Sequence, residues 1–408
     1  MLKALKRLVV AATILSGPFA SAAAATPSGH HLFVWAGDRD KQGRNFIAVI
    51  DADPASPSYG KLITSSATDL TSRNPHHTEY WMPESGMLFA NDHDANETVI
   101  LDLNDPQKPR QVARFGSMGG FAMPHSFLRL PNGNVIASFQ YPDQEMDHGA
   151  GHVMTGKHGG LVEIDDRGRL VRAASNADPA FSSEGLLPYS IAVLPDKDRL
   201  LVTNSPMGDD VLLTSNSYQV FRLSDLKLLG THRLDPGPRL SGHVSPEEAR
   251  VGPDGAVYIQ TLSCGIQRVT GLDRDRPEAR LVHQFEGSWC GVPTIVGHYL
   301  VQSVPAMNGF VVLDIRNGER PVEVSRLAIP GYAPHWTGWD PKAKRLVVTS
   351  GKAGDRTYLL TLDENSGKLA IDERFKDADG KAGVSFDRRV WPHGWTGAAK
   401  PHGAVFSR

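Results

Sequence analysis

Cysteine, excess charge and long apolar runs are all scarce in this sequence. Only Cys264 and Cys290 are present, which excludes a disulfide-rich scaffold but allows one bridge in an oxidising compartment. The formal net charge is −2, so the chain lacks the basic surface on which binding to nucleic acid depends. After the N-terminal segment, no stretch approaches the roughly 20 apolar residues of a membrane-spanning helix. We therefore expect neither a nucleic-acid partner nor a membrane span.

The first residues follow the order of a secretory signal peptide. A basic region comes first, a short apolar run over residues 8–20 follows, and the small residues ASAAAA then offer a cleavage site. The basic region contains Lys3, Lys6 and Arg7. Cleavage near Ala25 would remove these three cations and change the formal charge from −2 to −5. We expect a signal peptide over residues 1–25 and an exported protein, which in a bacterium is periplasmic.

Helical periodicity is also scarce, and the chain is a series of short β-type runs separated by Gly, Pro, Asn and Asp. Six segments share one order: a proline, a short strand, a tight turn and a second, apolar strand. They begin at residues 74, 123, 187, 245, 291 and 333. A third and a fourth strand follow most of them, as in TVILDLND and RQVARF after the first. The repeating unit therefore has four strands.

The two ends of the chain complement each other. KPHGAVFSR (400–408) supplies an inner strand with no strands after it, while residues 31–37, 45–53 and 60–66 are strands with no inner strand before them. Joining these ends completes a seventh unit and removes two exposed sheet edges. The sequence therefore predicts an all-β protein. Residues 26–408 are predicted to form one seven-bladed β-propeller, closed by pairing the C-terminal strand with the N-terminal strands.

The first strand of each propeller blade lines the central channel, so the residue after each proline is expected at one height in every blade. These residues are His76, His125, Tyr189, Glu247, Thr294, His335 and His402. Any one of the four histidines, alone, is more often a structural residue that caps a loop. Four at one register is different, because neutral imidazoles are good ligands for copper, iron, zinc and nickel. We predict a metal site formed by the four histidines.

Further residues near this ring are candidates for the site. His77 is included as a ligand, although strand alternation points it away from the axis unless the strand start is irregular. Glu247 and Tyr189 are predicted to hydrogen-bond the ligands, or to act as a proton carrier and a substrate contact. The loops after each second strand lie on the same face. They place His93 near the ring as an accessory group.

Cys264 and Cys290 are expected on the histidine face of adjacent blades. A disulfide near the site and copper ligation by a thiolate are the two alternatives. The long loop over residues 141–160 contains three histidines and is either a lid over the channel or a solvated insertion. Four tryptophans near strand entrances form either a small apolar pocket or contacts between blades: Trp81, Trp289, Trp336 and Trp339.

The motifs IAVIDADPASPSYGKLI (47–63) and NPHHTEYW (74–81) resemble the selenium-binding protein family, which includes the bacterial methanethiol oxidases. PHSF, HGGLVEID and the late PHG also look like elements of that family. The resemblance implies a periplasmic copper propeller that converts methanethiol, oxygen and water to formaldehyde, hydrogen sulfide and hydrogen peroxide. It also implies copper ligation by His76, His77, His125 and His402. The chain departs from the family pattern by carrying His335 and by lacking a cysteine after His402.

Three functional hypotheses follow. The first is a copper oxidase whose partners are a small thiol or sulfur compound and oxygen. The second is an iron oxygenase with four histidine ligands, as in the carotenoid-cleaving propellers. The third is a metal-free binding or scaffold propeller, because one fold supports many functions. Metal content separates the third hypothesis from the others, and metal identity separates the first two.

Overall fold

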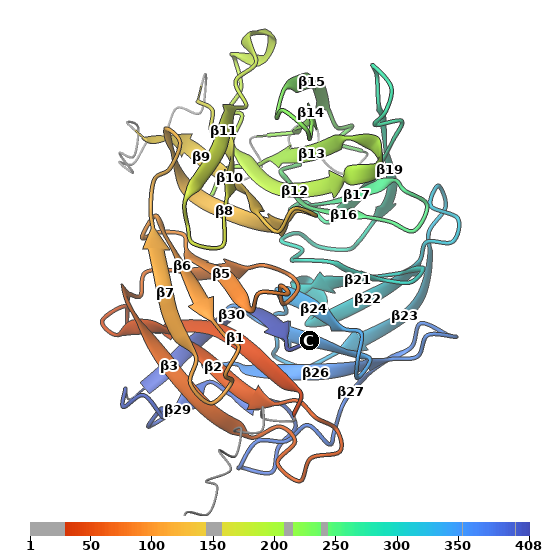
Figure 1. The fold of residues 1–408 in the computed structure, drawn as a ribbon. Helices are drawn as coiled ribbons and strands as arrows, with labels where there is room; N and C mark the ends of the chain where they lie inside the picture. Colours follow the sequence, from red (N-terminus) through yellow and green to blue (C-terminus); the bar gives the residue numbers. More distant parts are fainter. Residues whose placement is uncertain (1–28, 144–156, 208–214, 238–243, 353, 396) are drawn as a thin grey trace, which may run out of the picture.

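The computed structural model describes residues 29–143, 157–207, 215–237, 244–352, 354–395 and 397–408. These residues form seven antiparallel sheets arranged around a central axis, which confirms the predicted seven-bladed propeller (Figure 1). The helices of the described segments are single 3-10 turns: η2 (Pro179–Phe181), η3 (Pro195–Lys197) and η4 (Pro305–Met307). None of the helices in this part of the chain is long and apolar enough to cross a membrane.

Each of the first six blades consists of four consecutive strands, counted from the channel outward. Blade 1 contains β4 (Pro75–Thr78), β5 (Met87–Asp92), β6 (Glu97–Asp102) and β7 (Arg110–Phe115). Blade 2 contains β8 (Phe121–Arg129), β9 (Val135–Pro142), β10 (Gly160–Ile164) and β11 (Leu170–Ser175). Blade 3 contains β12 (Pro188–Leu194), β13 (Arg199–Asn204), β14 (Ser217–Arg222) and β15 (Leu228–Arg233).

Blades 4 to 6 repeat the same order. Blade 4 contains β16 (Pro246–Val251), β17 (Val257–Thr261), β18 (Gly265–Thr270) and β19 (Glu278–Gln284). Blade 5 contains β20 (Thr294–Val296), β21 (Tyr299–Val304), β22 (Gly309–Asp314) and β23 (Val322–Ala328). Blade 6 contains β24 (Trp336–Asp340), β25 (Arg345–Thr349), β26 (Arg356–Leu362) and β27 (Leu369–Ile371), with β28 (Val384–Ser385) paired to β26.

Blade 7 is built from both ends of the described chain, as the sequence predicted. Its sheet order is β29 (Asp387–Arg388), β30 (Gly397–Phe406), β1 (His31–Asp38), β2 (Arg44–Asp51) and β3 (Leu62–Thr71). β30 pairs with β1 in an antiparallel register that places Leu32 opposite Phe406 and Val34 opposite Ala404. The propeller is therefore closed by backbone hydrogen bonds between the first and the last long strand.

The strand sequences follow the position of each strand within its blade. The third strand of blade 5, β22 (GFVVLD), is buried at all six positions, because neighbouring blades cover both of its faces. The outer strand β23 instead alternates between exposed and partly buried residues. The apolar core lies between the blades. Trp336, for example, is fully buried and its Nε1–H donates to the carbonyl of Ala404 in blade 7 (3.1 Å).

The two cysteines form a disulfide between neighbouring blades. Cys264 lies between β17 and β18, Cys290 immediately precedes the inner region of blade 5, and their Cα atoms are 5.0 Å apart. Of the two alternatives that the sequence left open, the structure shows the disulfide, so neither sulfur is available as a thiolate ligand.

We expect the double variant Cys264→Ala/Cys290→Ala to fold but to lose about 3 kcal/mol of unfolding free energy, because the disulfide closes a loop with a sequence separation of 26 residues. Urea denaturation followed by tryptophan fluorescence measures this loss. Wild-type protein in a reducing buffer is the matched control and should reach the same midpoint. An unchanged midpoint in both samples would contradict the prediction.

Candidate metal centre

A β-bulge interrupts the inner strand of blades 1 to 4 at the height of the predicted ring. Pairing with the second strand shifts register between Pro75 and Thr78, Pro124 and Phe127, Pro188 and Ile191, and Pro246 and Ala249. A bulge places two residues opposite one, so side chains adjacent in sequence can both face the channel. Its effect is clearest at His77, whose ring stacks on that of His76 with centroids 4.1 Å apart. Simple strand alternation, which pointed His77 away from the axis, is therefore wrong here.

Polar side chains of the second strands hold these bulges. The amide N–H of the second bulge residue donates to such a side chain in each of the four blades: His77 to Asn91 (2.7 Å), Ser126 to Ser138 (3.1 Å), Ser190 to Thr203 (3.0 Å) and Glu248 to Gln260 (3.3 Å). The same four side chains donate to carbonyls of the next blade: Asn91 to Pro124 (2.6 Å), Ser138 to Tyr189 (2.7 Å), Thr203 to Glu247 (2.5 Å) and Gln260 to Cys290 (2.8 Å). The ring backbone is thus positioned by the neighbouring blade.

The sequence predicted Thr294 at the ring position of blade 5. The structure places Gly291 there instead. Ser303 donates to the carbonyl of His335 (2.9 Å) and Thr349 to that of His402 (2.7 Å), which continues the same pattern of contacts. The N–H of Gly291 bonds to the carbonyl of Ser303, as that of His335 does to Thr349. A Cβ on Gly291 would lie 2.6 Å from the His335 carbonyl oxygen, so the close blade contact requires glycine.

Thr294 lies farther along the inner strand of blade 5, where its hydroxyl contacts that of Thr337 at 2.7 Å. The misplacement has a simple cause. In the other six blades a proline precedes the ring residue, whereas in blade 5 the proline follows Gly291 at position 293. The backbone supports the new assignment, because the residue two before the ring position has positive φ in blades 2, 4 and 5: Met123, Ser245 and Trp289.

All five predicted histidine ligands converge on the channel axis. Ring centroids are 4.8 Å apart for His76 and His125, 4.5 Å for His76 and His402, and 4.7 Å for His335 and His402. One nitrogen from each of His76, His335 and His402 lies within 4.8 Å of the other two, and the same limit holds for His76, His77 and His125. His76 belongs to both groups, so the five residues make one continuous cluster, which we call the histidine cluster.

Five ring nitrogens of the histidine cluster are buried and have no protein partner. Unpaired buried atoms are Nδ1 of His76, both ring nitrogens of His77, Nε2 of His125 and Nδ1 of His402. At His125 the tautomer is fixed, because Nδ1–H donates to the carbonyl of Tyr189 (2.9 Å) and leaves the lone pair of Nε2 free. A buried polar atom without a partner costs about 1–3 kcal/mol. Five such nitrogens at one place therefore fit a metal ion.

His93 lies beside the cluster but is engaged elsewhere. Its ring centroid is 5.8 Å from those of His76 and His125. Its Nε2 contacts Oε1 of Gln140 at 2.8 Å, and its Nδ1 contacts the carboxylate of Asp94 at 3.3 Å. Both nitrogens have partners, so His93 supports the cluster and does not complete it.

Burial keeps the histidine cluster neutral. Loss of hydration holds the pKa of His76, His77, His125 and His402 well below the ordinary value of 6.5, and neighbouring cationic forms lower it further. Burial, together with the nearby charge of Lys400, lowers the pKa of His335 to about 4. Neutral imidazoles have a lone pair to offer to a metal, so the electrostatics of the site favour ligation at neutral pH.

Glu247 and Tyr189 occupy the ring positions of blades 4 and 3, as predicted. The Tyr189 ring lies 3.8 Å from that of His125 and packs against it. Burial, reinforced by neighbouring Glu248, raises the pKa of Glu247 well above its ordinary value, which favours the protonated form of this carboxyl group. Gln260 Nε2 donates to Glu247 Oε2 (3.3 Å). The cluster therefore has, across the ring, a carboxyl group whose protonated form is favoured by burial.

A second polar group, centred on Glu248, lies next to His77 of the cluster. It was not predicted from the sequence. Glu248 Oε2 accepts hydrogen bonds from the Tyr80 hydroxyl (2.6 Å) and from Arg250 Nη1 (2.9 Å). Its other oxygen has no hydrogen-bond partner and lies 3.9 Å from His77 Nε2. The sequence signal was the EEAR stretch, whose second glutamate faces the channel only because of the bulge. We call Tyr80, Glu248 and Arg250 the channel plug.

The four tryptophans do not form one pocket. Trp81 and Trp339 line a cavity at the far end of the channel, Trp336 packs between Tyr80 and His77, and Trp289 is 51% exposed. Of the loop over residues 141–160, positions 144–156 lie outside the described residues, and so do two of its three histidines. The third, His158, is near Ser175 and Gly159.

No protein-family model matches the chain. A curated methanethiol oxidase from Hyphomicrobium sp is 30% identical over 128 residues, which covers 30% of this chain and 28% of that relative. The match thus spans less than a third of the length of the relative.

Solved structures share the fold over nearly the whole chain. A hypothetical selenium-binding protein from Sulfolobus tokodaii has a TM-score of 0.68 at 16% identity and covers 92% of this chain and 93% of its own. A periplasmic gluconolactonase from Pseudomonas aeruginosa has a TM-score of 0.62 at 14% identity and covers 93% and 99%. The chain resembles the selenium-binding protein family. The sequence match to a methanethiol oxidase confirms this resemblance over its 128 residues, and the structural likeness shows a shared fold.

We expect His125→Ala to lose bound metal and to keep its fold, because His125 offers a free, oriented Nε2 and the inter-blade core lies elsewhere. His93→Ala is the matched control and should keep its metal, since both of its nitrogens already have protein partners. Elemental analysis and circular dichroism on the two variants measure the outcome. Equal metal content in the two variants would contradict the ligand assignment.

The metal-free protein is expected to lose stability as the pH falls below about 6.5. Histidines of the unfolded chain take up protons in this range, whereas the pKa values of the buried cluster are lowered, so the unfolded state binds more protons. Urea midpoints between about pH 7.5 and about pH 5.5 measure the loss.

His76→Gln should make this pH dependence shallower, because it removes one of the suppressed titrations. The titration of Glu247 changes stability in the opposite direction, since its raised pKa favours the folded state as the pH falls. Variant and wild type both contain Glu247, so its contribution to the pH dependence cancels in the comparison. A pH dependence that is identical in both would show that the cluster is not held neutral.

Proposed function

We propose that the protein is a copper-dependent oxidase of a small thiol, with a reaction like that of methanethiol oxidase. In that reaction, methanethiol, oxygen and water give formaldehyde, hydrogen sulfide and hydrogen peroxide. The observation that carries the proposal is the histidine cluster, whose buried nitrogens lack protein partners. The sequence match to a methanethiol oxidase supports the choice of substrate class.

His76, His77, His125, His335 and His402 would hold the metal. When bound, copper would supply a soft Lewis acid for sulfur and a redox partner for oxygen. Copper is favoured over other divalent first-row metals by imidazole ligands in general.

The surroundings of the cluster favour a small substrate. His125 is fully buried and His76 is 4% exposed, while His335 is partly exposed and marks the open side. The carbonyl of Tyr189 orients His125, and the Tyr189 ring packs on its face. A thiol with one carbon fits such an enclosed site better than a bulky one.

Glu247 would be the proton carrier of the reaction. Hydrogen sulfide and hydrogen peroxide both leave with protons, and burial raises the pKa of Glu247, which favours its protonated form. Gln260 orients its carboxyl group. Glu248 is held by Tyr80 and Arg250, so it is placed as a fixed negative charge behind His77.

We also propose that the protein is exported to the periplasm. Residues 1–25 have the order of a signal peptide, although they lie outside the described residues. The Cys264–Cys290 disulfide supports an oxidising compartment. N-terminal sequencing of the protein from a periplasmic fraction tests the cleavage near Ala25.

A four-histidine iron oxygenase is the second candidate, favoured by the number of imidazoles in the cluster. A metal-free propeller would have to bury several imidazole nitrogens without compensation, which disfavours it. Metal analysis distinguishes the three functions.

Protein purified without a metal-binding affinity tag is expected to contain about one copper per chain. With methanethiol and oxygen it should release hydrogen sulfide and hydrogen peroxide in equal amounts. Iron in place of copper would favour the oxygenase. Absence of any metal, even after incubation with copper, would refute both metal-dependent functions.

Glu247→Gln tests the proton carrier separately from the metal site. The variant should keep its copper but turn over roughly 10²-fold more slowly, because it keeps the shape of the side chain and loses the proton. Loss of copper in this variant would instead make Glu247 a part of the metal site. Full activity would exclude the residue from the reaction.

A further inference from the structure

The carboxylate of Glu248 is held through only one of its two oxygens. Its Oε2 accepts three hydrogen bonds: from the Tyr80 hydroxyl (2.6 Å), from Arg250 Nη1 (2.9 Å) and from the Ser190 hydroxyl (3.2 Å). Its Oε1 is buried and has no hydrogen-bond partner. Three donors on one oxygen fix the orientation of the carboxylate, so the direction of Oε1 is set by the fold.

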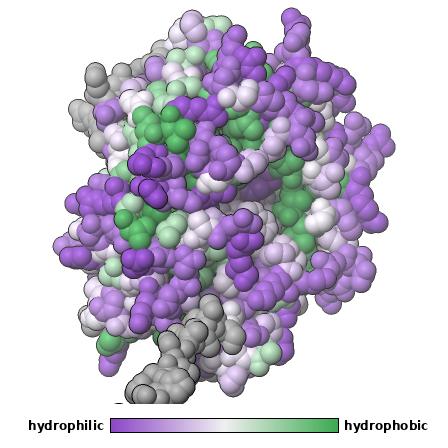
Figure 2. Space-filling model, viewed as in Figure 1, coloured by the Kyte–Doolittle hydropathy of each residue, from purple (hydrophilic) through white to green (hydrophobic). Residues whose placement is uncertain are grey.

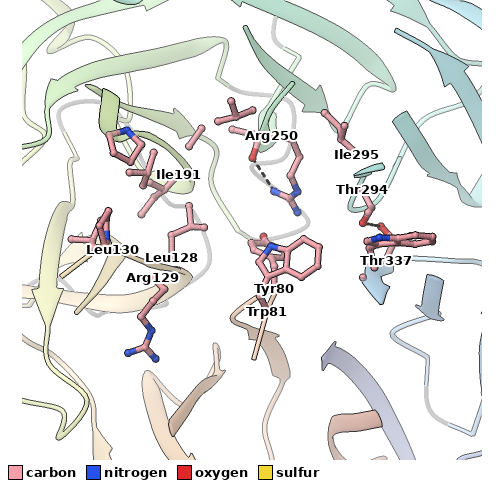
Figure 3. A pocket seen from close by; sticks show the side chains of 18 residues that line it. Tyr80, Trp81, Leu128, Arg129, Leu130, Ile191, Arg250, Thr294, Ile295 and Thr337 are labelled. Atoms are coloured by element: carbon pink, nitrogen blue, oxygen red, sulfur yellow. Dashed lines mark hydrogen bonds between the residues drawn. The ribbon is translucent and has the colours of Figure 1, made fainter. Parts of the chain in front are cut away.

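The other two members of the channel plug cover Glu248 on the side away from the histidine cluster. A cavity of about 490 Å³ lies on that side, and its lining includes Tyr80 and Arg250 but not Glu248. Figure 2 shows a hollow near the middle of the molecule, and Figure 3 shows Tyr80 and Arg250 among the side chains that line the cavity. Since Glu248 is 1% exposed, the partner of Oε1 has to come from the protein.

The polar atom of the cluster nearest to this oxygen is Nε2 of His77, at 3.9 Å. The ring of His77 is packed among other rings, with centroids 4.1 Å from His76, 4.5 Å from His125 and 5.1 Å from Trp336. These contacts hold the plane of the ring, but they do not decide which of its nitrogens carries the proton. That choice depends on the polar group at the edge of the ring, which is Glu248.

A hydrogen bond between the two atoms would satisfy both. A carboxylate accepts hydrogen bonds and does not donate them, so the proton of the neutral imidazole would be on Nε2. The two atoms lie about 1 Å beyond hydrogen-bond distance. Both are buried and have no other partner, so closing this gap would satisfy two groups at once.

The same pairing accounts for the number of unpaired nitrogens in the cluster. Five are buried without a partner, although only four histidines supply them. Assigning Nε2 of His77 to Glu248 leaves one lone pair from each: Nδ1 of His76, Nδ1 of His77, Nε2 of His125 and Nδ1 of His402. Glu248 would then do for His77 what the carbonyl of Tyr189 does for His125.

We propose that Glu248 is the positioning residue of His77: its Oε1 accepts the Nε2–H and directs the Nδ1 lone pair toward the metal. A carboxylate on the second nitrogen of a histidine ligand fixes the tautomer and makes the imidazole a stronger donor. Its negative charge also favours the more highly charged oxidation state of a copper ion. The tautomer is a property of the metal-free chain, whereas the effect on copper rests on the proposed function.

The tautomer is measured first, on the metal-free protein. Long-range proton–nitrogen NMR spectra of protein with isotope-labelled histidine distinguish a proton on Nε2 from a proton on Nδ1, and His77→Gln identifies the signal. We expect the Nε2–H form for His77. The Nδ1–H form would overturn the proposal.

Copper binding is measured next, by titration of copper(II) in competition with a chelator. Glu248→Gln should bind copper(II) about 10- to 100-fold more weakly than wild type, and its copper should have a higher reduction potential. Glu163→Gln is the matched control, because Glu163 is also buried and paired with an arginine, Arg172, but lies on the third strand of blade 2. The control should keep the wild-type affinity. Unchanged affinity in Glu248→Gln, or equal losses in both variants, would overturn the proposal.

Tyr80→Phe covers the case in which Glu248→Gln does not fold. It keeps the carboxylate and removes the shortest of the three bonds that orient it, so the affinity for copper(II) should fall about ten-fold. Wild-type affinity in this variant would contradict the proposal. Wild-type protein that binds no copper would refute the proposed oxidase, and the tautomer of His77 would still decide whether Glu248 pairs with it.

Discussion

Hydrogen bonds from the second strand of one blade to the backbone of the next hold the centre of this propeller together. Six such bonds run around the channel, from Asn91, Ser138, Thr203, Gln260, Ser303 and Thr349 to carbonyls at or next to the following ring position. Each joins a strand of one sheet to the inner strand of another, so the height of every ring residue depends on its neighbour. Side chains distant in sequence can converge only because this backbone is fixed.

The repeat and the closure could be predicted from the sequence because they depend on local signals. Proline, strand and turn recur with the period of a propeller blade. The pairing of β30 with β1 completes the seventh blade. Four histidines were found because they share one position relative to a proline. Gly291 was missed because the proline of blade 5 lies two residues after the ring position and not one residue before it, so a pattern anchored on proline places the ring position three residues too late, at Thr294.

The bulges could not be predicted, because they depend on partners outside the inner strand. Whether His77 and Glu248 face the channel is decided by Asn91 and Gln260, which accept their amide hydrogens from the second strand. No property of the HH or EE pairs alone distinguishes this arrangement from regular alternation. The tautomer of His125 is equally non-local, since it depends on a carbonyl in blade 3. The chemistry of the site is therefore set by contacts between blades.

The closing strand has a consequence for the order in which the molecule is assembled. His402 lies on β30, between His335 of blade 6 and His76 of blade 1, and β30 is also the strand whose pairing with β1 joins the two ends. A chain whose ends have not yet met lacks this part of the histidine cluster. Since a ligand stabilises the state that binds it, an ion held by the complete cluster would stabilise the closed propeller, in which β30 is paired with β1. Metal binding and closure of the propeller would then occur as one step. A chain whose ends have not paired would bind the metal more weakly.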